Sequence, residues 1–113
     1  MRSYTLDVSP VEIRVNEHTF HLQKSDGEAY QMVCSYMDYI RTCGKDADCI
    51  RRFIARGCEL ADELLGAGAC FKIFGSNPIS LGHIVSLCAQ IAGGCLRSYR
   101  RYLKKEYLEV DDA

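Results

Sequence analysis

The sequence predicts a mainly α-helical protein of the α+β class, with a short N-terminal antiparallel β-hairpin, two to three long helices and one short helix. Two patterns carry this prediction. Hydrophobic and polar residues alternate between residues 11 and 22, which is the period of a half-buried strand, and from residue 29 onward hydrophobic residues recur at helical spacing. With 113 residues, 48% of them hydrophobic, we expect a single domain over residues 1–113 with its own core.

The hairpin is expected over about residues 10–23. Asn16-Glu17 suits a tight turn because Asn tolerates positive φ. A lone hairpin is marginal in water, so its apolar face should lie on the helices or on another copy of the chain. Residues 4–8 are a weaker candidate for a further strand. The alternating apolar residues are Val11, Ile13, Val15, Phe20 and Leu22.

Two long helices are expected next, over residues 26–42 and 47–65. Ser25 with Glu28 three residues later forms a capping-box pattern, Gly44 follows the first helix, and Asp46 or Asp48 opens the second. Both segments carry an apolar stripe at helical spacing. The stripes are Ala29, Tyr30, Val33, Tyr36, Met37 and Ile40 in the first helix, and Ile50, Phe53, Ile54, Gly57, Cys58, Ala61, Leu64 and Leu65 in the second.

A short helix over residues 69–74 and a long one over about residues 80–107 complete the predicted elements. Glycines flank the short helix and permit helix ends there, and Ser76-Asn77-Pro78 interrupts the pattern before Ser80, which can cap the last helix. The apolar stripe of the last helix is expected to be Leu81, Ile84, Val85, Cys88, Ile91, Ala92, Cys95, Leu96, Tyr99 and Leu103.

Seven cysteines are the unusual feature of the composition. Their odd number, the absence of C-x-x-C and the lack of an export signal argue against a disulfide framework, so most are expected to be reduced core residues. His18 and His21 fall on opposite faces of the predicted strand, and no cysteine spacing suggests a metal site. No cysteine is marked out beside a base. We therefore expect no enzyme, metal or cofactor; the alternative, a thiol enzyme, requires one thiol of unusually low pKa.

The balance of charge excludes a broad attraction to polyanions. Fourteen Lys and Arg against fifteen Asp and Glu leave a formal charge of -1. No apolar run approaches the roughly 20 residues of a membrane-spanning helix, and the first residues lack the apolar core of a secretion signal. We expect a cytoplasmic protein that does not interact with membranes.

A basic cluster with interleaved tyrosines marks the last predicted helix, within an arc of roughly 140° opposite the apolar stripe. The simplest interpretation is the solvated back of an amphipathic helix, with cations favoured near its C-terminus by the helix dipole. Acidic residues follow at once and dilute the positive charge, which favours this interpretation. The alternative is a surface for an acidic protein partner or, less favoured, for nucleic acid. The cluster consists of Arg97, Arg100, Arg101, Lys104 and Lys105.

Three segments resemble a family of small proteins from the tail gene clusters of phages and prophages of Gram-positive bacteria. The hairpin over residues 11–22 looks like the short hairpin of that family. Residues 64–75 resemble its Leu-Gly-x-Gly-(small)-x-x-x-(Ile/Leu)-Phe-Gly signature, and residues 77–81 resemble the turn that opens its last helix. The resemblance spans residues 10–98. Ala67 departs from it, since an acidic residue is common there.

The resemblance implies a tail assembly chaperone in a bacterial host cell, which binds the tape-measure or tail-tube protein before assembly; other proteins of this family have no known function. A chaperone of this kind is expected to depend on its partner or to associate with itself. A small helical protein can cover apolar helical segments of a partner that would otherwise aggregate. Phe71, Ile73 and Phe74, which stand between glycines, are the candidate contacts, although the more ordinary interpretation is that both Phe side chains fill the core. The competing hypothesis is a small helical nucleic-acid-binding or regulatory protein that uses the basic last helix.

Overall fold

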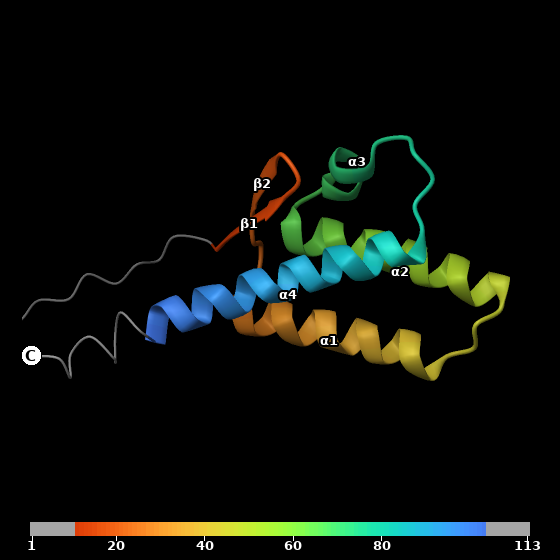
Figure 1. The fold of residues 1–113 in the computed structure, drawn as a ribbon, viewed down its shortest axis with the longest axis horizontal. Helices are drawn as coiled ribbons and strands as arrows, with labels where there is room; N and C mark the ends of the chain where they lie inside the picture. The colour runs from red at the N-terminus through yellow and green to blue at the C-terminus, as the bar shows by residue number, and fades with distance from the viewer. Residues whose placement is uncertain (1–10, 104–113) are drawn as a thin grey trace, which may run out of the picture.

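The computed structural model describes residues 11–103, with side chains to residue 100. The mainly helical α+β class is confirmed (Figure 1). The suggested strand over residues 4–8 and the expected end of the last helix at residues 104–107 lie outside the described residues. The elements are β1 (Glu12–Val15), β2 (His18–His21), α1 (Asp26–Thr42), α2 (Ala47–Leu65), α3 (Ala69–Phe74) and α4 (Leu81–Leu103).

Local caps explain where the long helices begin. The Ser25 hydroxyl accepts the Glu28 backbone N–H at 3.2 Å and starts α1. The Asp46 carboxylate accepts the Cys49 N–H at 2.8 Å, so Asp46 rather than Asp48 caps α2. At α4, the Ser80 hydroxyl accepts the N–H of His83 at 3.1 Å, and the backbone N–H of Ser80 donates to His83 Nδ1 at 3.3 Å. His83 is therefore part of a reciprocal cap.

The three long helices pack side by side, with α1 running antiparallel to both α2 and α4 (Figure 1). Gly57 of α2 lies at a close approach of the three helices, because a Cβ atom there would fall 2.7 Å from Tyr36 Oη of α1 and would overlap the Ile84 side chain of α4. The hydroxyl of Tyr36 donates to the carbonyl oxygen of Phe53 at 2.5 Å. The largest fully buried side chains are Phe53, Ile13, Leu64, Ile84 and Ile91.

The hairpin lies with its apolar face on the helices, as predicted. Ile13 pairs with Phe20 across the two strands, and both side chains are buried. Asn16 adopts a φ of 55°, which a tight turn requires and Asn tolerates. Ile13 packs directly onto Gly94 of α4, where a Cβ atom would overlap its Cδ1. The N–H of Gln23 donates to the Leu64 carbonyl oxygen at 2.8 Å and ties the hairpin to α2.

Three predicted core residues lie at the surface. Tyr30, Leu96 and Tyr99 are 38%, 38% and 54% exposed. Tyr30 stands at the margin of the α1 stripe, about 100° from Ala29 around the helix, and so misses the centre of the contact with α4. Leu96 and Tyr99 belong to the last turns of α4, which has 23 residues against 17 in α1 and projects past it (Figure 1). Leu87, which the predicted stripe omits, is buried.

Candidate functional site

The short helix α3 is set between glycines whose backbone conformations suit no other residue well. Gly68, at its N-terminal end, has a φ of 82° in the left-handed region, and Gly75, just after it, has a φ of 63°. Gly68 offers no side chain as a cap. Instead, the Asp62 carboxylate of α2 accepts the N–H of Cys70 at 2.9 Å. The helix is thus oriented by a carboxylate that lies eight residues earlier in the chain.

The side chains of α3 divide sharply between core and solvent. Ala69 and Cys70 are buried, and Ile73 and Phe74 are partly buried against the core, with the Phe74 ring 6.0 Å from that of His83. Phe71 is 70% exposed, more than any other exposed large hydrophobic residue described. The expectation that both Phe side chains fill the core is therefore wrong for Phe71. Of the three predicted contacts, Phe71 is the one presented to solvent.

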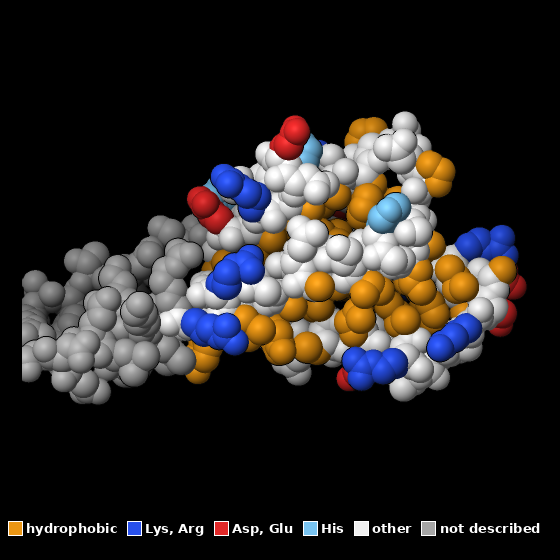
Figure 2. Space-filling view, viewed as in Figure 1, with side chains coloured by type: hydrophobic (Ala, Val, Ile, Leu, Met, Phe, Trp, Pro, Cys, Tyr) orange, Lys and Arg blue, Asp and Glu red, His pale blue; other side chains and the backbone are white. Residues whose placement is uncertain are grey.

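Apolar side chains also gather along the seam between α4 and α1, as well as around α3 and the loop that follows it (Figure 2). Partly buried hydrophobic residues that pack against the core include Met37 and Ile40 of α1 and Ala92 of α4. Their remaining exposure shows that the helices do not close the core completely.

The predicted basic cluster is present in part within the described residues. Arg97 and Arg100 are exposed on α4, beyond the buried Cys95. The side chain of Arg101 and all of Lys104 lie outside the described region. The exposed Leu96 and Tyr99 lie on the adjoining side of the same turns, so the end of α4 combines positive charge with apolar surface.

A groove that the sequence did not predict separates α1 from α2. Its volume is about 490 Å³, and Met32, Tyr36 and Leu60 are the least exposed side chains that line it. Adjoining it, a second hollow reaches Arg52 and shares Tyr39 and Arg56 with the first. The charged lining residues of the main groove are Glu28, Arg56, Glu59 and Glu63. Helical periodicity identified the α1 and α2 faces that pack inward, but it carries no signal for how far the two helices stand apart.

Fewer cysteines are buried than the sequence predicts: three of the seven are buried, Cys43, Cys49 and Cys58 are half-buried, and Cys34 is exposed. Cys70, Cys88 and Cys95 are buried, and burial raises the pKa of Cys88 to about 11. Burial and the neighbouring Cys58 raise the pKa of Cys70 to about 12. A raised pKa keeps a thiol protonated and weakens it as a nucleophile. Within residues 11–103, no group of His, Cys, Asp or Glu is arranged to hold a metal ion.

Searches of protein-family models, curated proteins and solved structures found no match for this chain. In the part of the chain that the structure covers, no helix has the length and apolar character to cross a membrane.

Proposed function

We propose that this protein is a non-enzymatic binding protein of phage or prophage tail assembly, which holds an apolar helical segment of the tape-measure or tail-tube protein before assembly. The observation that carries the proposal is the placement of Phe71, exposed on a short helix between two glycines of positive φ. The resemblance of residues 64–75 to the tail-cluster signature points to the same segment.

The energetics of α3 support a contact role for Phe71. A fully buried Phe side chain gains about 1.5–3 kcal/mol relative to an exposed one, and Phe71 forgoes most of that gain in the free protein. Docking of an apolar partner onto α3 would recover it. Aromatic residues that are exposed alone and buried on binding are frequent energetic centres of interfaces. The glycines allow α3 to adjust to the partner without strain in the long helices.

The state of the thiols supports a role without covalent chemistry. Catalytic cysteines work as thiolates, with a lowered pKa and a base alongside. Here burial raises the pKa values of Cys88 and Cys70. His83, the histidine of α4, is engaged in the cap with Ser80. These features favour packing and binding over catalysis.

Co-expression with the tape-measure and tail-tube proteins of the same phage or prophage tests the proposal. We expect the wild-type chain to co-purify with one of them and to keep it in the soluble fraction. Phe71→Ala should reduce the recovered partner about tenfold, as loss of an interface hot spot does. Tyr30→Ala, at an exposed aromatic residue of α1, is the matched control and should recover wild-type amounts. Failure of the wild-type chain to retain either tail protein would reject the proposal.

A further inference from the structure

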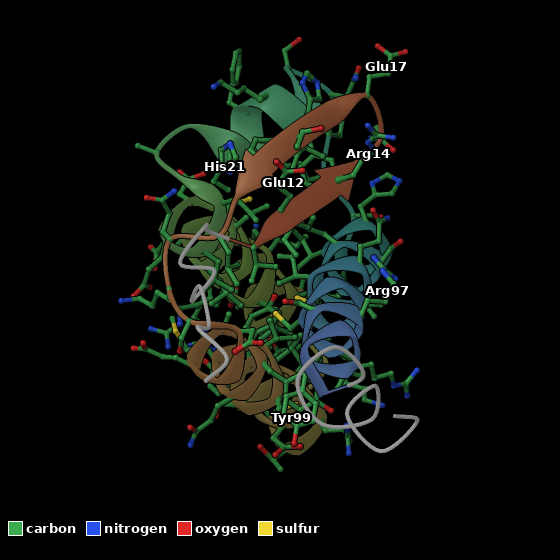
Figure 3. The ribbon with its side chains drawn as sticks, turned by 90° about the vertical axis from the view of Figure 1, so that its left-hand side faces the viewer. Glu12, Arg14, Glu17, His21, Arg97 and Tyr99 are labelled. Carbon is green, nitrogen blue, oxygen red and sulfur yellow. The ribbon has the colours of Figure 1, made fainter. Side chains whose placement is uncertain are left out.

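The last turns of α4 form an amphipathic surface, and no other segment within residues 11–103 packs over it. Leu96 and Tyr99 are 38% and 54% exposed. Arg100 follows Leu96 by 40° around the helix, and Arg97 follows it by about 100°, so one side of the helix is apolar and the adjoining side is basic. This segment projects from the bundle rather than lying against α1 (Figure 1). Figure 3 shows Tyr99 and Arg97 at this end of α4, pointing to different sides of the helix.

The groove between α1 and α2 has the opposite character. Its less exposed lining is apolar or aromatic, from Met32, Tyr36 and Leu60, and the α2 wall carries Glu59 and Glu63. Glu28 adds a third carboxylate from α1. A helix that lays its apolar side on this floor would place its neighbouring basic side against the two glutamates of α2. Docking there would add a fourth helix to the three that already pack together.

Cations near this groove reduce the attraction between its glutamates and a basic helix. Lys24 Nζ lies 3.9 Å from both Glu28 and Glu63, but these carboxylate side chains are more than half exposed, so the pairs are weak. Arg56 is drawn toward the Tyr39 ring, 6.0 Å from its centroid. Arg52, in the adjoining hollow, lies toward the other end of α2. Glu59 pairs with no cation within the described residues, and the lining of the groove as a whole has three carboxylates against one cation, Arg56.

The groove runs along α1 from Tyr39 to Glu28 and along α2 from Arg56 to Glu63, and its Glu28–Glu63 end is the one nearer to the projecting segment of α4. Because α1 runs antiparallel to α2 and α4, the start of α1 and the ends of α2 and α4 are on the same side of the bundle, and α4 continues past the end of α2 on that side (Figure 1). Two copies related by a two-fold axis across this end can therefore each place an α4 segment in the groove of the other. Such an exchange is closed, with the same contacts made twice.

We propose that this protein forms a reciprocal homodimer in which Leu96, Tyr99 and Arg100 of each α4 occupy the α1–α2 groove of the second copy. Leu96 and Tyr99 cover Met32, Tyr36 and Leu60, and Arg97 and Arg100 face Glu59 and Glu63. The dimer uses a surface separate from Phe71, so a test of the dimer does not depend on the proposed tail-protein contact.

Charge reversal in two matched variants tests the dimer by sedimentation equilibrium of the full chain. Wild type should dimerise more weakly as salt increases. Glu59→Lys/Glu63→Lys and Arg97→Glu/Arg100→Glu should each be monomeric, because like charges then face one another. An equimolar mixture should regain dimers, since each reversed groove meets a reversed segment. Circular dichroism and thermal melts of each variant verify that the fold is retained.

Two single substitutions separate this interface from other surfaces. Tyr99→Ser should raise the dimer dissociation constant about tenfold, whereas Phe71→Ala and Tyr30→Ser should leave it unchanged. Wild-type protein that remains monomeric up to about 1 mM would overturn the proposal. So would reversed variants that dimerise as wild type does, or a mixture that forms no dimers. Protein that stays monomeric and binds duplex DNA through Arg97 and Arg100 would also overturn the proposal, because these arginines would then contact nucleic acid.

Discussion

At the scale of single residues, the junction of Tyr36, Gly57 and Ile84 decides how closely the three long helices pack. The Tyr36 hydroxyl donates to the carbonyl oxygen of Phe53, and burial raises the pKa of this tyrosine. Gly57 leaves the space that the Tyr36 ring and the Ile84 side chain occupy. Glycine destabilises a helix interior by about 0.5–1 kcal/mol relative to alanine. The close packing of the helices that Gly57 permits compensates for this cost.

Gly57→Ala tests this junction. The added methyl group should destabilise the fold by about 1–3 kcal/mol, because Tyr36 and Ile84 must move and both are held by neighbours. Gly27→Ala is the matched control, since no atom lies within 4 Å of a Cβ built at that position of α1. Urea unfolding measures both variants. A Gly57→Ala protein as stable as wild type would show that the helices are not in close contact there.

At the scale of elements, boundaries proved the most predictable feature. The bounds of α1, α2 and α3 agree with those expected from the sequence, because Ser25, Asp46 and the glycines around residue 68 act on backbone groups only a few positions away. The link between Asp62 and Cys70 could not be predicted in this way. It joins two elements across a turn, and its geometry depends on the unusual φ angles of Gly66 and Gly68.

Asp62→Ala should loosen α3 while leaving the long helices intact. The substitution removes the acceptor for the Cys70 N–H, a loss of about 1 kcal/mol for one hydrogen bond. Hydrogen exchange measured by NMR should show faster exchange of the Cys70 amide, with the centre of α2 unchanged. Asp48→Ala is the control because its pair with Arg51 is exposed and contributes little. Unchanged exchange at Cys70 would mean that Asp62 does not orient α3.

At the scale of the whole molecule, helical periodicity predicts which face of each helix turns inward but not where neighbouring helices end. Leu96 and Tyr99 continue the apolar stripe of α4, yet α1 does not extend far enough to cover them. The α1–α2 groove could not be predicted for the same reason, because it depends on the distance between two helices. Phe71 was identified as a candidate contact from its glycine neighbours, but its exposure depends on how α3 docks.

The buried thiols predict a loss of stability in alkaline solution. Burial raises the pKa of Cys88 from its ordinary value of 9.0 to about 11, so the folded state retains a proton that the unfolded state releases. This contribution is complete below about pH 9 and is lost as the pH rises toward 11. Urea unfolding between about pH 8 and pH 11 should show a falling free energy of unfolding. Cys88→Ala should reduce that slope, whereas Cys34→Ser, at an exposed thiol, should retain it.

The proposed function requires that an exposed residue of α3 binds a tail protein without any chemical step. The affinity of wild-type and Phe71→Ala protein for the purified tape-measure or tail-tube protein, measured by titration calorimetry, tests it most directly. We expect wild type to bind, with Phe71→Ala weaker by about tenfold and Tyr30→Ala equal to wild type. Equal binding by wild type and Phe71→Ala would contradict the claim, and so would the absence of any binding.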